Sequence, residues 1–253
     1  MNATEASSAE KPGFWRRQFQ LPSTRPQRSF DLLFGILAPF LCVCFDPTVF
    51  RSDGLMGNGF LSPFRLYGYL EIAVSAAALA YYVGTRRASP LLAGALWGGF
   101  FFALILGVIM LPLTLLGLLL IIGVFGFTPF LTAFVFFRNA CRCWRDSSVR
   151  ATRKSTLVPV TLGMVLILGI PACLQASAFY LNSHAMVAIQ SGSDQDFARA
   201  VKTLQRTRFV ISPDGIAFAY QKASDERQRE RLARAFQAVT GRSVEKRLAE
   251  LND

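Results

Sequence analysis

The sequence is short of the residues from which soluble active sites are built. Its 253 residues include one histidine, His184, and only 17% are charged, whereas 52% are hydrophobic. It contains no nucleophile, phosphate-loop, zinc-protease or dinucleotide signature, and no histidine lies inside an apolar run, where a haem ligand pair would need one. We therefore predict neither an enzyme nor a protein with a cofactor.

Cysteine is scarce as well. The five cysteines lie within or beside apolar runs, at Cys42, Cys44, Cys141, Cys143 and Cys173. The polar C-terminal third has none, which argues against the disulfide framework of a small secreted domain. The two C-x-C pairs fall near opposite ends of the membrane helices predicted below, so they cannot share an ion and no metal site is predicted.

Charge is missing altogether from residues 91–137. At about 1.5 Å per residue this run would make a helix of ~70 Å, more than twice the ~30 Å hydrocarbon core of a bilayer. It must therefore fold as a hairpin of two membrane-spanning helices. Because proline disfavours helix in the residue before it, we place the turn at 111–114, around Pro112.

Other apolar runs are also long enough to cross a bilayer. We predict an all-α, polytopic membrane bundle of five transmembrane helices in residues 29–181, preceded by a basic tail at 1–28 and followed by a small soluble helical domain at 182–253. The five helices are expected at about 30–50, 66–84, 91–111, 115–137 and 157–181.

The distribution of Lys and Arg predicts the orientation. With the N-terminus in the cytoplasm, the cytoplasmic segments contain five, two and six basic residues, while the outer segment at 51–65 contains two. This agrees with the positive-inside rule and places the C-terminal domain outside the cytoplasm. Arg16-Arg17 also fits a twin-arginine signal, but Pro22 and Pro26 intervene before the apolar run.

Composition changes abruptly after Leu181, since 21 of the last 72 residues are charged against 22 of the preceding 181. Helical spacing of apolar residues predicts helices over 194–211 and 225–239 and a short one after Ser243, with Ser224 as an N-cap and Gly241 as the C′ residue. The predicted core consists of Phe197, Val201, Leu204, Leu232 and Phe236.

The segment 209–220 is open to two interpretations. Pro213-Asp214-Gly215 between short apolar runs fits a hairpin turn. Ser212 as N-cap with Pro213 and Asp214 in the first turn fits the start of a helix equally well. The spacing of Ile216, Ala219, Tyr220 and Ala223 favours the helix.

Ionisable residues inside membrane helices are the first functional candidates. Asp46 and Glu71 both fall toward the outer ends of their predicted helices, and Arg51 and Arg65 lie in the segment between them. We expect these four residues to form either a proton or ion site or a set of ion pairs that reach water.

Small residues predict where helices touch. Gly94 and Gly98 form a G-x-x-x-G in the third helix, and Ala76, Ala80 and Gly84 follow one face of the second. In the fourth helix, Pro129 with Thr128 and Thr132 predicts a kink whose freed backbone groups are satisfied by the hydroxyls.

Two functions from different classes remain. The first is an interaction or assembly module, in which the outer helical domain binds a protein partner through a basic face. That face comprises Arg227, Arg231 and Arg234, which share one side of a helix, with Arg229 nearby. The second is a transporter of a small solute or ion that uses Asp46 and Glu71. Apart from the lipid bilayer and such a protein we predict no partner, nucleic acid included, and the sequence does not determine the oligomeric state.

Overall fold

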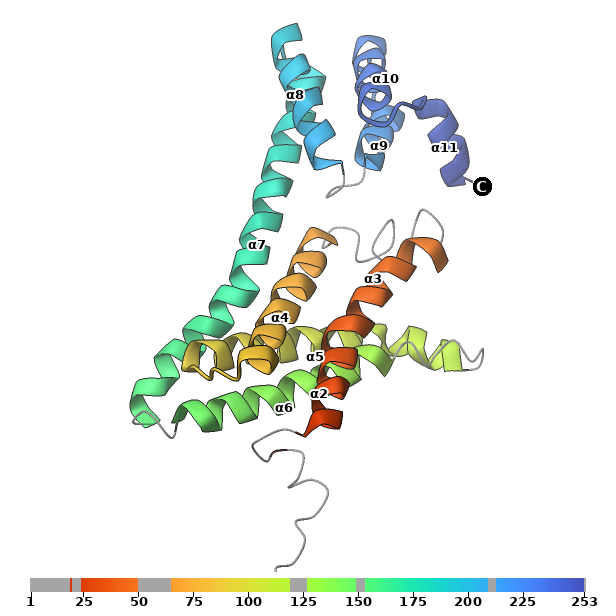
Figure 1. The fold of residues 1–253 in the computed structure, drawn as a ribbon. Coiled ribbons are helices and arrows are strands. Elements are labelled where there is room, and N and C mark those ends of the chain that lie inside the picture. The colour runs from red at the N-terminus through yellow and green to blue at the C-terminus, as the bar shows by residue number, and fades with distance from the viewer. Residues whose placement is uncertain are drawn as a thin grey trace, which may run out of the picture. The chain divides into compact units, whose positions relative to one another are not determined.

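The structure is a computed structural model that describes residues 19, 24–49, 65–118, 127–148, 153–208 and 213–252. Every regular element in these ranges is a helix, which confirms the all-α prediction (Figure 1). In chain order the helices are α2 (Arg25–Leu32), the π-helix η1 (Leu33–Leu37), α3 (Ala38–Val49), α4 (Arg65–Thr85), α5 (Pro90–Leu118), α6 (Thr128–Ser148), α7 (Arg153–Ser191), α8 (Asp194–Thr207), α9 (Asp214–Lys222), α10 (Glu226–Thr240) and α11 (Val244–Asn252).

Three of these helices are long and apolar enough to cross a membrane. Within the described residues they are Leu66–Thr85 in α4, Pro90–Leu111 in α5 and Leu157–Ser191 in α7. They correspond to the second, third and fifth predicted spans, although the last of them continues past the predicted end at 181 to Ser191. Helix α6 falls short because its second half contains Arg138, Arg142 and Arg145.

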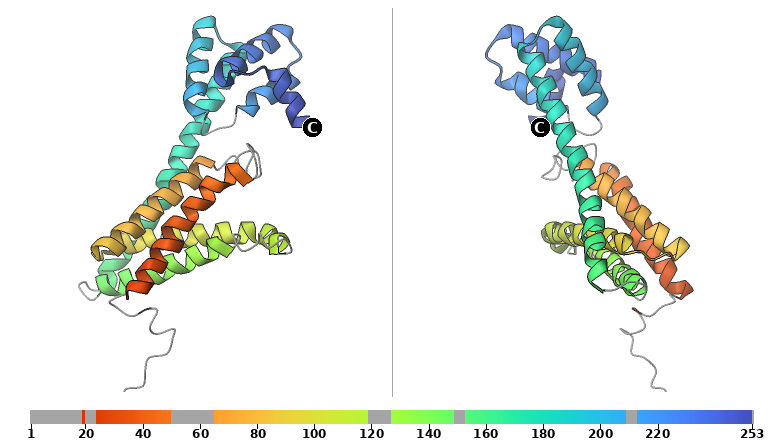
Figure 2. Two further views of the ribbon diagram at one scale, coloured as in Figure 1. Left: turned by 45° about the vertical axis from the view of Figure 1, so that its right-hand side comes forward. Right: turned by 90° about the vertical axis from the view of Figure 1, so that its left-hand side faces the viewer.

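The expected turn at 111–114 is wrong. Helix α5 continues through Pro112 to Leu118, and α6 begins at Thr128. The two helices lie side by side in Figures 1 and 2, so a helical hairpin does form, but its connection falls after Leu118. Proline restrains the residue before it without forbidding helix, and a long apolar helix can accommodate it.

The chain divides into two compact units, one comprising residues 1–42 and 72–168 and the other 43–71 and 169–253. In the first unit, residues of α4, α5, α6 and the start of α7 form a core that includes Leu79, Leu96, Val135, Phe136 and Val160. We refer to this unit as the helix bundle.

Glycines let α5 and α7 approach closely within the bundle. A Cβ placed on Gly94 would lie 1.9 Å from the carbonyl oxygen of Val160, and one on Gly163 would lie 2.0 Å from that of Leu91. The G-x-x-x-G of α5 is thus confirmed as a helix contact. The stripe on α4 is not, because Ala80 and Gly84 are exposed and nothing lies within 4 Å of a Cβ on Gly84.

In the second unit, the end of α7 and the helices α8–α11 share a core. Ile189 of α7, Val201 and Leu204 of α8, and Leu232 and Phe236 of α10 are all buried in it. Phe197 packs against the same core while partly exposed, so the predicted core residues are present. We refer to residues 182–252 as the C-terminal domain, although α7 passes through Leu181 without a break.

Helix ends in the C-terminal domain follow from local sequence. Residues 214–222 form helix α9, as the spacing favoured, but its N-cap is Pro213, not Ser212, and residues 209–212 lie outside the described part. The N-cap of α10 is Asp225, not Ser224, and its carboxylate accepts the N–H of Arg227. Gly241 ends α10 at φ +74°, which confirms the predicted C′ glycine.

Candidate functional site

The elements α2, η1 and α3 follow one another without a gap, and we refer to them together as the N-terminal helix. Its π-helical turn, η1, lies where this helix meets α6. In an α-helix the ring of Pro39 would press on the carbonyl of Gly35, and the wider turn at Leu33–Leu37 relieves that clash, with the Ala38 N–H donating to Leu33. The Phe34 carbonyl then has no backbone donor available, because Pro39 lacks an N–H. Instead the Thr132 hydroxyl donates to it at 2.7 Å.

This contact corrects the expectation for the fourth helix. Pro129 lies in the first turn of α6, where proline is tolerated, so no kink is needed inside the helix. The Thr132 hydroxyl bonds to the backbone of another helix and thereby joins α6 to the N-terminal helix.

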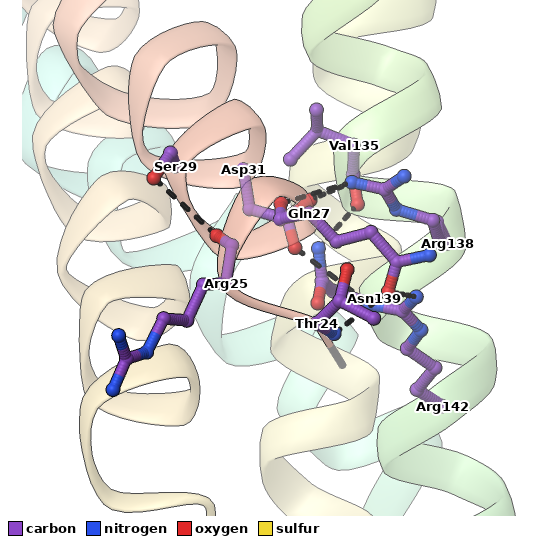
Figure 3. Close-up of polar contacts among 9 residues, drawn as sticks. All are labelled: Thr24, Arg25, Gln27, Ser29, Asp31, Val135, Arg138, Asn139 and Arg142. Atoms are coloured by element: carbon purple, nitrogen blue, oxygen red, sulfur yellow. Dashed lines mark hydrogen bonds and ion pairs between the residues drawn. The ribbon is translucent and has the colours of Figure 1, made fainter. Parts of the chain in front are cut away.

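Next to this junction lies a buried cluster of charges, which we call the Asp31 cluster (Figure 3). It consists of Asp31 on α2 with Arg138, Asn139 and Arg142 on α6, and each residue is at most 2% exposed. The Arg138 guanidinium donates to Asp31 Oδ1 and forms an ion pair with it, and Arg142 Nη1 lies 3.7 Å from Asp31 Oδ2. One carboxylate therefore lies between two guanidinium groups.

The first turn of α2 also contributes to the cluster. The Gln27 side-chain oxygen accepts hydrogen bonds from Arg142 Nη2 and from the backbone N–H of Thr24, both at 3.1 Å. The Gln27 carbonyl accepts a third, from Arg138 Nη2, at 3.4 Å. The arginines of α6 thus bind the start of α2 as well as its carboxylate, whereas Arg25 points away from them in Figure 3.

The rest of the Arg138 environment is aromatic. Its guanidinium carbon lies 5.4 Å from the ring centre of Phe30 and 5.5 Å from that of Phe134, within the range of cation–π attraction. Burying charges costs free energy that mutual attraction and hydrogen bonds must offset. The cluster is therefore suited to fixing which residues of α2 face which residues of α6.

The sequence analysis did not identify this cluster. The predicted fourth helix ends at 137, so Arg138 and Arg142 fall in the basic cytoplasmic segment after it, and Asp31 falls in the first predicted span without an assigned role. A usable signal was present: Val135, Arg138, Asn139 and Arg142 recur at helical spacing, which places the arginines on the same face as the buried apolar residues of α6.

Of the four residues predicted to gather at the outer ends of the helices, only Glu71 can be placed. It is fully buried on α4, in the second unit. Asp46 belongs to α3 and Arg65 begins α4, but the structure describes only their backbone. Arg51 lies outside the described residues altogether. The predicted grouping of Asp46, Arg51 and Arg65 with Glu71 therefore stays a prediction.

Glu71 lies one turn beyond a polar contact that the sequence did not predict. Gln175 of α7 is 6% exposed, and its side-chain oxygen accepts the backbone N–H of Tyr67 at 3.0 Å. It thus binds one of the free N–H groups at the start of α4. Two buried polar side chains, Glu71 and Gln175, accordingly lie on helices that are candidate membrane spans.

The predicted basic face of the C-terminal domain is present but partly engaged. Arg227 and Arg234 are exposed, whereas Arg231 is half-buried and donates to the Ser193 carbonyl at 3.4 Å. The guanidinium carbons of Arg231 and Arg234 lie 5.2 and 5.9 Å from the ring centre of Phe197. These two arginines therefore help to cover the domain's own core.

The cysteines do not come together with other metal-binding side chains in the described part of the chain, where no group of three such residues occurs. Cys42, Cys44 and Cys173 are exposed and Cys143 is buried against the backbone of Ser89, 3.6 Å from its carbonyl oxygen.

The chain matches no protein-family model, and comparison with curated proteins and with solved structures likewise finds no match. Its function must therefore be inferred from its own geometry and chemistry.

Proposed function

We propose that the chain is an integral membrane protein of five membrane-crossing helices whose C-terminal domain acts as an interaction or assembly module outside the cytoplasm. The observation that supports this most is the construction of the domain itself. It has its own core, and the last turns of α7, a candidate membrane span, contribute Ala185 and Ile189 to that core. A domain whose core includes the last turns of a membrane helix stays at the membrane surface, where a protein partner can bind it.

The Asp31 cluster supports the two additional crossings. The N-terminal helix and α6 are less apolar than the three candidate spans because they contain Asp31, Arg138 and Arg142. Those charges face one another and are buried, which is how charged residues are accommodated in membrane bundles. The N-terminal helix would then be the first span and α6 the fourth, and the basic counts would put the N-terminus in the cytoplasm.

Reporter fusions test the topology. A reporter after Asp253 should report an extracytoplasmic location, and reporters after Ser89 and Ser147 a cytoplasmic one, because of the distribution of basic residues. A cytoplasmic signal from the Asp253 fusion would contradict the five-span arrangement.

Copurification from mild detergent tests the interaction. The full-length protein should retain a stoichiometric protein partner, and the double variant Arg227→Glu/Arg234→Glu should lose it, since both side chains are exposed on α10. Arg231 is left unchanged because it contacts Ser193 and Phe197. Lys246→Glu, an exposed charge reversal on α11, is the matched control. The absence of a partner, or its retention by the double variant, would contradict this role of the basic face.

A transporter of a small solute or ion is the second candidate, and the complete burial of Glu71 favours it. A buried carboxylate on a membrane helix is a suitable proton or cation site. Glu71→Gln keeps the shape of the side chain and removes its charge. It should therefore abolish proton-dependent solute uptake by vesicles that contain the protein, while leaving the protein inserted in the membrane. Unchanged uptake in the variant would exclude Glu71 from transport.

A further inference from the structure

Helix α7 indicates where the chain leaves the membrane. Large apolar side chains are exposed on it through Ile170, Leu174 and Leu181, as expected of a surface that faces lipid, and beyond Leu181 the described part of α7 exposes one more, Val187. Tyr180, 64% exposed, packs against His184 with ring centres 4.2 Å apart, and Asn182 and Ser183 lie between them. Amphipathic aromatic side chains followed by polar ones are typical of the headgroup level of a bilayer.

Helix α8 returns from the end of α7 toward this level. Only Gly192 and Ser193 separate the two helices, and a Cβ on Gly192 would lie 2.5 Å from the Ala188 carbonyl oxygen, so the turn needs glycine. The Ser193 hydroxyl caps α8 by accepting the Asp196 N–H at 3.3 Å. Figure 1 shows α8 folded back along the last turns of α7.

A small pocket confirms how far α8 returns. Asn182 and Met186 of α7 line it together with Thr207 and Arg208 at the end of α8 and Pro213 before α9. From Asn182 to Ser191, α7 rises by about 14 Å, and the 14 residues of α8 extend for about 20 Å. The C-terminal end of α8 therefore reaches the level at which α7 becomes polar.

The charges of α8 are divided along its length. Its acidic residues, Asp194 and Asp196, lie in the distal half together with one cation, Arg199, while Lys202 and Arg206 lie in the half that returns toward Asn182. Lys202 and Arg206 are exposed and four residues apart, so they share one face, opposite the buried Ala200 and Leu204. Two cations thus project from the edge of the domain that adjoins the end of the apolar part of α7.

We propose that this edge docks on the anionic phospholipid headgroups of the membrane that α7 crosses, with Lys202 and Arg206 as the headgroup-binding side chains. The inference depends on the membrane insertion in the proposed function, but not on a protein partner. Opposite charge and proximity both favour lipid, because each basic side chain near a bilayer surface is attracted by anionic headgroups. Docking would hold the C-terminal domain against the membrane and leave α10, with Arg227, available to a protein.

The test uses the full-length protein in nanodiscs of phosphatidylcholine, with or without phosphatidylglycerol, and measures amide hydrogen exchange in α8. Phosphatidylglycerol should slow exchange in the second half of α8, and high salt should remove the effect. In Lys202→Gln/Arg206→Gln, loss of two basic contacts should weaken docking by about thirtyfold and abolish the slowing.

The control is Arg227→Gln, which removes an exposed charge at a membrane-distal position. Arg227 belongs to the end of α10 next to Arg231, which contacts Ser193 at the distal start of α8. This variant should keep the lipid effect, and exchange in the core of α10 should stay unchanged in both variants. Equal exchange in the two lipid mixtures, or equal loss in both variants, would overturn the proposal.

The outcomes separate this inference from the proposed function. If the reporter fusions support the topology and phosphatidylglycerol has no effect, only lipid docking fails. If Lys202→Gln/Arg206→Gln instead loses a copurified protein without any lipid effect, the edge binds a protein and the proposal is overturned. If Cys173 in α7 reacts with a membrane-impermeant thiol reagent in intact nanodiscs, the membrane insertion on which both depend is wrong.

Discussion

The helix bundle and the C-terminal domain each contain an aspartate–arginine ion pair that links two helices, but the two pairs differ in their surroundings. In the bundle the side chains of Asp31 and Arg138 are 1% and 3% exposed, and a second guanidinium, Arg142, adjoins the carboxylate. In the C-terminal domain the side chains of Asp214 and Arg247 are 11% and 16% exposed. There, Arg247 Nε and Nη2 bind the two carboxylate oxygens at 2.9 and 3.2 Å.

The difference lies in what remains when one partner is removed. Loss of Asp31 leaves two buried guanidinium groups with no route to water except by moving α6 or α2 apart. Loss of Asp214 leaves an arginine at the edge of the domain, which water can reach. The aspartate–arginine pair of the bundle therefore strongly constrains how α2 is placed against α6. The pair of the C-terminal domain links α9 to α11 more weakly.

The largest effect is expected from Asp31→Asn, which keeps the shape and removes the charge. Because it leaves buried cations uncompensated, it should lower the free energy of unfolding by about 3–5 kcal/mol. Denaturant titration of the full-length protein in detergent, followed by circular dichroism, measures this.

A double-mutant cycle sharpens the result. If Arg138 is the principal partner, Arg138→Gln in the Asp31→Asn background should cost far less than in the native protein. Additive costs would show that the two side chains do not stabilise each other, and the cluster would then have no role in placing α2 against α6.

A second prediction tests whether the bundle can relax around such a change. Gly94→Ala puts a methyl group against the backbone oxygen of Val160, which cannot rotate away, and should cost about 1–3 kcal/mol of unfolding free energy. Gly84→Ala is the matched control, because Gly84 is exposed on α4 and nothing lies within 4 Å of a Cβ placed on it. This variant should be neutral or slightly stabilising. A tolerated Gly94→Ala would mean that α5 and α7 can move apart, so that the Asp31 cluster could relax too.

The sequence predicted the helices better than the contacts between them. Apolar length and periodicity were sufficient for α4, for α5 as far as Leu111, for most of α7 and for the core of the C-terminal domain, because those signals are local. The continuation of α7 to Ser191 was missed because the predicted span ended where the apolar run ended, whereas the helix continues until Gly192.

The Asp31 cluster could not be derived in the same way. Asp31 lies over 100 residues from its partners on α6, and the basic residues around Arg138 and Arg142 are typical of a cytoplasmic loop. Only the pairing of α2 with α6 turns them into buried partners. That pairing depends on the π-turn before Pro39 and on the Thr132 contact to Phe34, which connect two distant segments.

A smaller effect is expected in the C-terminal domain. Asp214→Asn should lower the free energy of unfolding by about 1 kcal/mol, since the pair is partly exposed and Arg247 also contacts Glu250 at 3.3 Å. Thermal unfolding of the full-length protein measures it. A cost as large as that of Asp31→Asn would remove the proposed distinction between the two pairs.

The smallest effect concerns the start of α8 and depends on pH. Asp196 accepts hydrogen bonds from the Ser193 hydroxyl at 2.7 Å and from the Ser193 backbone N–H at 3.3 Å, and these bonds hold the pKa of its carboxyl below the ordinary 3.8. A carboxyl with a lower pKa in the folded state binds fewer protons there than when unfolded, so it stabilises the fold above pH 3.8. That contribution should diminish as the pH falls from 3.8 through the lower folded-state pKa.

Ser193→Ala should remove this part of the acid sensitivity, whereas Ser191→Ala, a serine outside the cap, should retain it. Amide exchange in the first turn of α8, measured across the acid range in all three proteins, tests this. An identical pH profile in the native protein and Ser193→Ala would show that the cap does not govern the titration of Asp196.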